Sequence, residues 1–441
     1  MLDLERLPVF TCLYIHSINQ NSLNENLMTV NKLLYVFVLM CSNTFAQTKA
    51  FKSIRDFNVT PSNTAAVNKI NLQKAIDWAS RKGAALFVEP GEEPYAVDGG
   101  IILKPNVSLI GANGPVPGGT SHPSKKQPVG SVFKITDKTN SFITVESATQ
   151  IKGIQFWYPD QTLTDAKVII PYPATIQNAK NKLVEGVYLS CLTFYGEYLA
   201  MDFTASLRHP VALVISEHCY GYPLSGEFIR ISHCYDIPRI LHCHVNPALQ
   251  RLFKGDYSPA VIDAVVAQKT YAYAIDYTDN AQLMDLFTFG TYGGIMLGGD
   301  TYGQLTNFNF DCVATGIYKK GSQAVNRNWQ ISQGSIISNT GEKVNDLHPV
   351  IIEGEGHTSL SNVEIFSGPN LALTTVPEHQ SWDYLLVRGN KKLTVTLTGC
   401  RMVKYMADNP ISVENKAAVI QVIGCVDKNQ APLNCIINEQ P

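Results

Sequence analysis

The hydrophobic residues of this chain recur in a short pattern: an apolar residue, two others, a second apolar residue and, two places later, an aromatic or polar residue. Copies of this pattern start at Ile151, Leu189, Ile237, Leu283, Leu305, Ile331 and Leu360. Successive copies are therefore 38, 48, 46, 22, 26 and 29 residues apart. A period of about 20–50 residues is typical of solenoids, and short strands without a helix in each repeat indicate a parallel β-helix. The shorter steps correspond to single coils and the longer steps to coils that carry insertions.

The segment from Gly226 to Asn246 shows how one coil is built. A short apolar strand around Ile229 and Ile231 leads into a polar corner at residues 232–236, and a second apolar element follows. Strand, corner and strand make one coil, whose inner side chains pack on the neighbouring coils. The sequence therefore predicts an all-β chain, folded as a single-stranded right-handed parallel β-helix, which is a solenoid.

A capping helix is predicted at residues 68–82, before the first coil. Apolar side chains recur there at helical spacing, as at Leu72, Ile76 and Ala79, and Gly83 follows where a helix C-cap is expected. Because the open end of a solenoid exposes apolar side chains and unpaired backbone groups, a cap is expected there. The predicted organisation is an N-terminal cap at 47–104, a β-helix at 105–430 and a tail at 431–441.

Residues 1–46 have the pattern of a leader rather than of a folded segment. A basic start and an apolar run at residues 33–40 are followed by small residues up to Ala46. This pattern predicts a secretory signal peptide at residues 28–46, and the apolar run is too short to span a membrane. We therefore expect a secreted or periplasmic protein that begins at Gln47.

Composition narrows the range of functions. The chain has 441 residues, of which 45% are hydrophobic and 16% charged, and its formal net charge is −2. Such a chain offers no strongly basic surface for nucleic acid or for an anionic membrane. Its length without an evident linker suits a solenoid, because each coil buries its inner face on its neighbours.

Eight cysteines follow residue 46, and two interpretations of them stay open. An even number of cysteines in an exported protein is typical of disulfides. Cys400 and Cys425, however, each follow a glycine at matching positions one coil apart, which favours a stack of free, buried thiols. The chain has no CxxC motif and no Cys/His spacing of a zinc site, so no metal site is predicted.

The N-terminal segment carries a family resemblance. AIDWASRKGAALFVEPG, from Ala75, and GGIILKPNVSLIGANG, from Gly99, resemble the start of the pectate-lyase superfamily of right-handed β-helices, especially its rhamnogalacturonase- and epimerase-like group. The later AIDYTDNAQLMDLFTFG, from Ala274, is similar to proteins related to glycoside hydrolase family 28. The resemblance implies a carbohydrate-active protein. The NTD, DD, GHG and RIK signatures of that family do not stand here intact, and the pectate-lyase calcium and arginine motifs are missing.

The central coils hold the candidate acid–base residues. Matching these coils by their second-strand pattern places Arg230 and Asp276 at facing outer positions, where a solvated ion pair is the alternative. Asp279 and Asp300 fall in the same corner of successive coils. Carboxyl groups about 5 Å apart suit a retaining glycosidase, and about 6.5–9.5 Å suits an inverting one. The alternative is that these aspartates cap turns.

Residues for substrate binding are expected in the same coils. These candidates are Arg230, His233, Arg239, His242 and His244. An excursion at residues 245–271, with a short helix that begins at Ser258 and Pro259, interrupts the coils here. Long loops on a rigid scaffold often carry function, so the excursion is expected to wall a cleft. Glu353 and Glu355 rank below the central aspartates.

The leading functional prediction is an exported enzyme that cleaves a pectin-like or other acidic polysaccharide by glycoside hydrolysis. Its catalytic residues would be Asp276, Asp279 and Asp300. A polysaccharide lyase is one alternative, and Ca²⁺ is expected as a cofactor only for that reaction. A non-catalytic carbohydrate-binding or adhesin-like β-helix is the other. In each case the partner is a polysaccharide or oligosaccharide, with no nucleic acid and no membrane span, and the oligomeric state is open.

Overall fold

The computed structural model describes residues 50–114, 121–122, 127–248, 257–321, 328–338, 347–366, 382–403 and 405–438. The predicted leader at residues 1–46 lies outside the described residues, as do residues 249–256 of the excursion. The described strands and helices all belong to the compact unit Phe51–Pro441.

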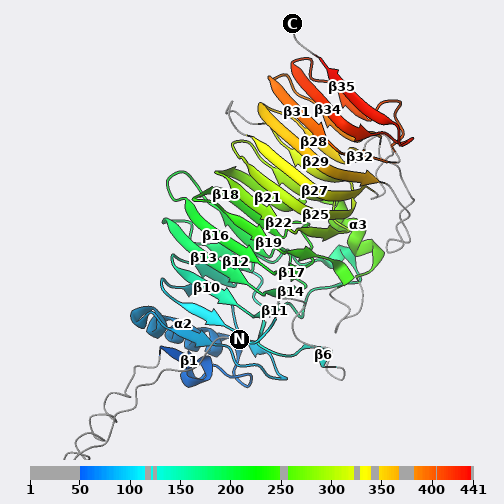
Figure 1. The fold of residues 1–441 in the computed structure, drawn as a ribbon. Helices are drawn as coiled ribbons and strands as arrows, with labels where there is room; N and C mark the ends of the chain where they lie inside the picture. Colours follow the sequence, from blue (N-terminus) through cyan, green and yellow to red (C-terminus); the bar gives the residue numbers. More distant parts are fainter. Residues whose placement is uncertain are drawn as a thin grey trace, which may run out of the picture. The chain divides into compact units, whose positions relative to one another are not determined.

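Parallel strands stacked in three ladders make up most of this unit (Figure 1). Each strand of a coil pairs in parallel with its counterpart in the next coil. Val187 lies beside Val214 in the first ladder, for example, and Met201 lies beside Ile229 in the third. Neighbouring strands in a sheet are about 4.8 Å apart, so the ladders fix the spacing between equivalent side chains of successive coils.

The strands of each ladder follow in chain order. The first ladder consists of β1 (Phe51–Ser53), β2 (Ala85–Phe87), β5 (Ser108–Ile110), β10 (Thr149–Lys152), β13 (Val184–Ser190), β16 (Val211–Glu217), β19 (Arg239–Leu241), β22 (Ala281–Met284), β25 (Gly303–Val313), β27 (Trp329–Ser338), β29 (Gly356–Phe366), β31 (Leu393–Thr398) and β34 (Ala418–Val426). The second consists of β3 (Tyr95–Ala96), β8 (Val132–Lys134), β11 (Gln155–Trp157), β14 (Thr193–Tyr195), β17 (Tyr220–Gly221), β20 (His244–Val245), β23 (Phe287–Phe289), the later parts of β25, β27 and β29, and β32 (Arg401–Met402).

The third ladder carries Arg230, His233 and Asp276 of the candidate residues. It consists of β4 (Ile101–Leu103), β9 (Ile143–Val145), β12 (Ile176–Asn178), β15 (Met201–Thr204), β18 (Ile229–Tyr235), β21 (Tyr271–Thr278), β24 (Gly293–Leu297), β26 (Thr315–Lys319), β28 (Val350–Ile352), β30 (Leu385–Val387) and β33 (Ile411–Val413). Outside the ladders, β6 (Ser121–His122) and β7 (Gln127–Pro128) form a separate antiparallel pair.

One residue in each of ten coils, at the corner between the first and second ladders, has a left-handed backbone conformation. These residues have φ between 52° and 66° and are Gly153, Cys191, His218, His242, Asp285, Asn307, Gln333, Asn362, Gly399 and Gly424. A single left-handed residue bends the chain sharply, and Gly and Asn adopt this conformation most readily. The repeated sequence pattern spans this corner, because its two apolar residues are buried on either side of it, as Leu189 and Leu192 are around Cys191.

One copy of the pattern lies elsewhere than expected. Ile240, not Ile237, pairs with Ser216 and Leu283 of the neighbouring coils, so this copy starts three residues later. Asp236 and Ile237 have left-handed conformations of their own, with φ of 57° and 63°. The chain therefore makes an additional turn before β19, and Ile237 belongs to that turn.

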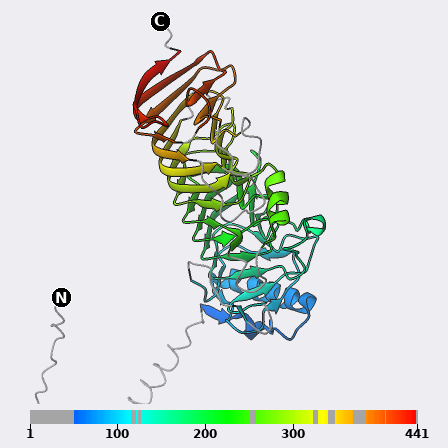
Figure 2. The same ribbon diagram turned by 90° about the vertical axis from the view of Figure 1, so that its right-hand side faces the viewer.

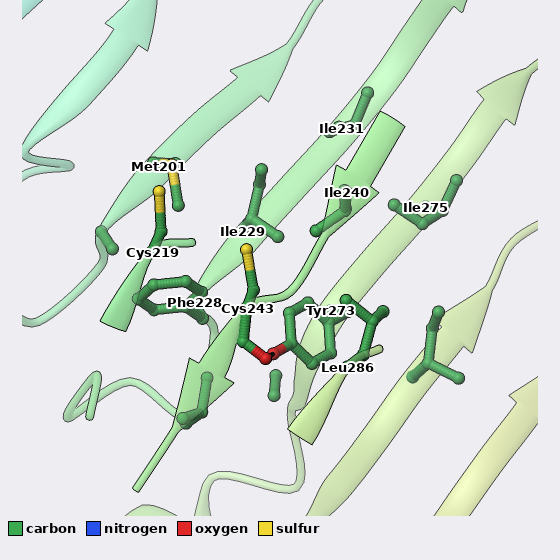
Figure 3. Close-up of a cluster of buried hydrophobic side chains, with 14 of the residues drawn as sticks. Met201, Cys219, Phe228, Ile229, Ile231, Ile240, Cys243, Tyr273, Ile275 and Leu286 are labelled. Carbon is green, nitrogen blue, oxygen red and sulfur yellow. Dashed lines mark hydrogen bonds between the residues drawn. The ribbon is translucent and has the colours of Figure 1, made fainter. Parts of the chain in front are cut away.

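Apolar side chains from all three ladders fill the interior. The rings of Phe156 and Phe194 stack at 5.2 Å, and Phe194 meets Phe228 edge-on at 5.7 Å. Figure 3 shows a part of this core in which Cys219 and Cys243 point between the ladders. All eight described cysteines are free and six of them are buried, so the free-thiol interpretation is confirmed.

The helix predicted before the first coil is present as α2 (Ala65–Lys82) and begins three residues earlier than expected. Thr64 caps it by accepting a hydrogen bond from the backbone N–H of Val67, and Gly83, in a left-handed conformation, ends it. A short 3-10 helix, η1 (Ile54–Phe57), precedes it. At the other end of the unit β35 (Pro432–Ile437) pairs antiparallel with β34.

The helix expected in the excursion is confirmed as α3 (Pro259–Ala267). Ser258 is its N-cap and Pro259 its first residue, as the sequence predicts. A 3-10 turn, η2 (Ala166–Val168), lies near α3 in another insertion. Figure 2 shows α3 on the outside of the stacked coils.

Candidate functional site

The structure does not bring Arg230 and Asp276 together as expected. β18 pairs with β21 so that Arg230 lies beside Ala274, two residues short of Asp276. The expected register was wrong because it was counted back from the displaced copy of the pattern. Arg230 instead binds Asp202 at 3.0 Å and Glu227 at 3.3 Å, so its charge is compensated within the wall of the solenoid.

Asp276 caps the backbone of the following coil. Its Oδ1 accepts hydrogen bonds from the N–H of Gly299 at 2.8 Å and from that of Tyr277 at 3.1 Å. A Cβ added at Gly298 would lie 2.3 Å from the same oxygen, so a glycine is needed there for the carboxylate to reach. These are the contacts of a turn cap, and the catalytic role of Asp276 stays a prediction.

Asp279 and Asp300 lie where expected, in the corner that joins the third ladder to the first on successive coils. The N–H of Asp279 donates to the carbonyl oxygen of Cys234 at 3.4 Å. The hydroxyls of Thr278 and Thr301 lie 2.9 Å apart and join the two coils at this corner. The ladder thus holds both aspartates at one edge of the solenoid, and their acid–base role stays a prediction.

The candidate histidines contact different neighbours rather than one another. The ring of His233 stacks on Tyr277 at 4.7 Å. The ring of His242 stacks on His218 at 4.6 Å, and its Nδ1 lies 2.8 Å from Oδ2 of Asp285. His242 and His218 are corner residues with left-handed backbones, so their rings follow one another along the corner.

His244 belongs to an aromatic stack on the outer face of the second ladder. Its ring lies 5.5 Å from that of Tyr220 and 4.2 Å from that of Phe287, and the planes are nearly parallel. Burial lowers the pKa of His244, so the ring is mostly neutral at pH 7. Because the rings cover one another's faces, the stack favours packing over sugar binding. Arg239, expected to bind substrate, is hydrogen-bonded to Gln282 of the next coil at 3.1 Å.

An open hollow lies further along the edge that carries Asp300. Its volume is about 450 Å³, and its lining residues are Gly321, Glu353, Gly354, Glu355, Gly389, Asn390 and Lys391. These residues follow the strands β26, β28 and β30 of the third ladder. The hollow therefore occupies the same corner of the coils as Asp279 and Asp300.

A column of glycines connects the two places. Gly299, Gly321, Gly354 and Gly389 each stand two residues after a matching position of the third ladder. A Cβ added at Gly321 would lie 3.6 Å from the Cα of Gly354, and one added at Gly299 would lie 3.5 Å from the carbonyl oxygen of Gly321. With coils about 4.8 Å apart, the glycine column spans roughly 14 Å. It gives this corner a floor without side chains.

Tyr318, Glu353 and Arg388 form a hydrogen-bonded group beside the hollow. The Tyr318 hydroxyl donates to Oε1 of Glu353 at 2.5 Å, and Nε of Arg388 donates to Oε2 at 2.8 Å. Nη2 of Arg388 also donates to the Tyr318 oxygen at 3.2 Å. Burial works to raise the pKa of Glu353, but these bonds outweigh it and hold that pKa below its usual value. Glu353 is therefore an ionised carboxylate at neutral pH.

Lys319 lies beneath the hollow, at an inward position level with Leu297 and Ile352. It is 1% exposed, and its Nζ donates to the carbonyl oxygens of Glu353 at 3.4 Å and Glu355 at 3.2 Å. Burial lowers the pKa of Lys319 to about 8. At neutral pH most of the molecules therefore carry a positive charge under the floor of the hollow.

Sequence reasoning did not find Tyr318, Lys319 or Arg388. Two signals point to them once the ladder is known. One is a glycine two residues after β24, β26, β28 and β30, and the other is a lysine at a position that is apolar in the coils on either side, at Leu297 and Ile352. In the described ranges, no group of three or more His, Cys, Asp and Glu side chains is placed to hold a metal ion. No helix in those ranges is long and apolar enough to cross a membrane.

Comparison with solved structures identifies the fold. No family model and no curated protein sequence matches the chain. The structure of DFA-IIIase from Arthrobacter chlorophenolicus A6 matches with a TM-score of 0.50 and 9% identity, over 87% of this chain and 97% of that one. That neighbour is a right-handed β-helix protein. The fold of this chain is a β-helix.

Two further structures match at lower TM-scores. Gene product 12 of bacteriophage phi29 has a TM-score of 0.49 and 12% identity. The match covers 91% of this chain but only 60% of the phage protein. The A-module of mannuronan C-5 epimerase AlgE4 from Azotobacter vinelandii has a TM-score of 0.42 and 11% identity, over 84% of this chain and 99% of the module. At such identities the likeness concerns the fold alone.

Proposed function

We propose that this chain is an exported enzyme that binds an acidic polysaccharide along the glycine column and cleaves it at the hollow. In this proposal the coils form one continuous right-handed β-helix, α2 caps its N-terminal end, and the chain is related to the rhamnogalacturonase- and epimerase-like group. Export rests on the predicted signal peptide at residues 28–46, and the relationship rests on the resemblance of the N-terminal segment.

The observation that carries the proposal is the environment of Glu353. Its carboxylate is ionised and held in place by a phenol and a guanidinium, Tyr318 and Arg388. It lines a hollow of about 450 Å³ whose floor lacks side chains. Preorganised polar groups around an open, concave space are what a catalytic site requires.

The charges around the hollow suit a sugar that carries a carboxylate. Lys391 lines the hollow, and its Nζ lies 3.7 Å from Oε1 of Glu355. Lys319 adds a buried positive charge below the floor. The coils repeat about every 4.8 Å, and a polysaccharide is itself a regular repeat of sugars. Successive sugars could therefore meet equivalent positions along the glycine column.

Glycoside hydrolysis is the reaction proposed first, because two carboxyl groups line the hollow. In this scheme ionised Glu353 is the nucleophile or base, and Glu355 on the other side of Gly354 gives a proton to the leaving oxygen. Glycosidases need two carboxyl groups in different protonation states. Asp276, Asp279 and Asp300, near the other end of the glycine column, form the rival catalytic set.

A lyase is the second candidate, favoured by the Tyr318–Arg388 contact. β-Elimination from a uronate needs a base to take the proton next to the carboxylate and cations to stabilise the charge that develops. Arg388 and Lys391 would hold the carboxylate, and Tyr318 or Glu353 would transfer the proton. Ca²⁺ belongs to this proposal only.

The test is a screen of plant and algal acidic polysaccharides with the purified protein. New reducing ends without ultraviolet-absorbing products identify a hydrolase, and unsaturated, ultraviolet-absorbing ends identify a lyase. Binding without cleavage identifies a carbohydrate-binding module and contradicts an enzymatic role. If the protein neither binds nor cleaves any of the acidic and neutral polymers, the proposal as a whole is contradicted.

A further inference from the structure

The carboxyl group of Glu197 is buried inside the solenoid. Glu197 follows Gly196 in the corner between β14 and β15, and its side chain is 0% exposed. Neither of its carboxyl oxygens has a hydrogen-bond partner. Since buried polar groups are nearly always hydrogen-bonded, an unpaired buried acid of this kind calls for a physical explanation.

The space for this carboxyl group comes from a missing side chain. A Cβ added at Gly221, in the next coil, would lie 2.3 Å from Oε1 of Glu197 and 2.9 Å from a ring carbon of Phe228. The carboxyl group thus occupies the space that a side chain at position 221 would fill. The N–H of Leu224 donates to the carbonyl oxygen of Glu197 at 3.0 Å, which holds the backbone of Glu197 in this corner.

The ionisable side chains that face Glu197 are tyrosines. Tyr158 in the preceding coil and Tyr257 in the excursion interact electrostatically with it, and Tyr222 lies against Tyr257. Asp263 of α3 acts on Tyr222 rather than directly on Glu197. No cation compensates a charge on Glu197 in the described surroundings, so ionisation would leave a bare negative charge in an apolar space.

The described part of the excursion, residues 257–271, covers this place. The ring of Tyr257 lies 4.9 Å from that of Tyr222, and its hydroxyl donates to the Tyr222 carbonyl oxygen at 3.4 Å. The N–H of Ser258 donates to the carbonyl oxygen of Leu163 at 2.8 Å, and the Ser258 hydroxyl donates to that of Thr164 at 3.0 Å. Figure 2 shows α3 on the outside of the coils, and α3 belongs to none of the ladders.

We propose that Glu197 is a proton-operated latch: residues 257–271 close over it while its carboxyl group is protonated, and ionisation releases them. The released proton goes to solvent, and the carboxylate gains water when Tyr257 and α3 move away. Residues 257–270 of this excursion belong to no ladder, and the third ladder resumes only at Tyr271, where β21 begins. These residues can therefore move without breaking a ladder pairing.

Linkage fixes the direction and size of the effect. Burial raises the pKa of Glu197 from 4.5 to about 8 in the closed state, and the N–H groups of Glu197 and Tyr222 oppose this only in part. These two N–H groups lie near the carboxyl group without meeting hydrogen-bond geometry. The closed state therefore binds the proton more tightly than the open state. The closing equilibrium falls about tenfold per pH unit between pH 4.5 and about 8 and then levels off, by about 3,000-fold in all.

Hydrogen exchange of the full chain between pH 5 and 9 tests this proposal. Protection factors of residues 257–271, corrected for the intrinsic exchange rate at each pH, should fall about tenfold per unit up to about pH 8. Those of β31, which is paired on both sides, should stay constant. Glu197→Gln, which keeps the shape without the charge, should abolish the fall. Glu185→Gln, the same change at an exposed position, should retain it.

Several results would overturn the latch. One is wild-type protection of residues 257–271 that does not depend on pH, and another is an undiminished fall in Glu197→Gln. A parallel loss of protection in β31 would mean that ionisation loosens the whole solenoid instead. Should Glu197→Gln not fold, Ser258→Ala weakens closure without touching Glu197. In Ser258→Ala the protection factors of residues 257–271 should be lower at every pH but fall with pH as steeply as in the wild type. Protection factors that do not fall with pH in this variant contradict the proposal.

Discussion

Each end of the glycine column has an acidic side chain, and the two side chains differ in their hydrogen-bond partners. At one end, Asp276 gives an oxygen to two backbone N–H groups of its own corner and the next coil. At the other end, Glu353 is held by the side chains of Tyr318 and Arg388 and borders an open hollow. Asp276 lies near the end of β21 and Glu353 directly follows β28, both strands of the third ladder, and each is beside a glycine of the column.

The difference shows which carboxylate is available to a ligand. A carboxylate bonded to backbone groups stabilises the turn it caps, and moving it would leave those N–H groups unpaired. A carboxylate bonded to other side chains can exchange those partners for a ligand without disturbing the backbone. The position under Glu353 also differs, since Lys319 stands in a column that is apolar at Ile275 and Leu297.

The largest expected effect is that of Glu353→Gln. The change keeps the size of the side chain but removes its charge and its capacity to accept a proton. General acid–base catalysis contributes about 10²–10⁴-fold, so kcat on the substrate found in the screen should fall by that factor, with a thermal midpoint close to that of the wild type. Steady-state kinetics and a thermal melt of the same preparation measure both quantities.

Glu364→Gln is the matched control for that variant. Glu364 also pairs with an arginine, Arg401, at 2.8 Å, but it projects from the second ladder. Its loss should leave kcat unchanged. Full activity in Glu353→Gln, together with loss of activity in Asp279→Asn or Asp300→Asn, would show that the active site lies in the central coils and not at the hollow.

The next effect is on stability and concerns Lys319. Its pKa falls from 10.5 to about 8 on burial, so the folded state binds this proton less tightly than the unfolded state. The stability linked to Lys319 is therefore complete above about pH 10.5 and is lost as the pH falls to 8, by about 3 kcal/mol. In Lys319→Met this dependence disappears. Urea denaturation of both proteins at pH 7.5, 9 and 10.5 measures this dependence. If their free energies of unfolding differ by the same amount at all three pH values, the pKa of Lys319 is not lowered by folding.

The fold was predictable because its main determinant repeats along the sequence. Each coil buries two apolar residues on either side of a left-handed corner residue, as Leu305 and Phe308 do around Asn307, and such pairs remain visible when insertions separate them. The displaced copy had the same apolar content. Its additional turn at Asp236 and Ile237 could not be recognised, because an isoleucine in a left-handed conformation has no sequence signature.

The site was less predictable because it depends on register between distant segments. Tyr318, Glu353 and Arg388 lie 35 residues apart in each step, which is longer than the step of a coil without an insertion. An error of two residues in register was enough to pair Arg230 with the wrong aspartate. Asp279 and Asp300 were placed correctly because a single coil without a long insertion separates them.

Adding a side chain at either end of the glycine column should show whether the ligand binds at the hollow alone or along the whole column. Gly321→Leu places its Cβ at ordinary contact distance from Gly354, and the rest of the side chain then rises into the hollow. Steric overpacking costs about 1–3 kcal/mol, so we expect oligosaccharide affinity to fall roughly 10–100-fold by isothermal titration. Gly299→Leu meets equally mild contacts at the other end. It should weaken binding only if the ligand runs along the whole column, so equal losses would favour a long ligand and a loss at Gly299 alone would contradict the hollow.

The smallest expected effect is that of Asp276→Asn. The asparagine carbonyl oxygen can still accept from the N–H of Gly299 and Tyr277, so only the charge that strengthens those two bonds is lost. We expect the free energy of unfolding to fall by about 1 kcal/mol or less and kcat to stay within about twofold of the wild type. Asp276→Ala, in contrast, leaves the half-buried N–H of Gly299 without this partner and should cost about 1–2 kcal/mol, still without loss of activity per folded molecule. If Asp276→Asn instead loses activity a hundredfold at an unchanged thermal midpoint, its carboxylate acts on the substrate, and the two ends of the column have been assigned the wrong way round.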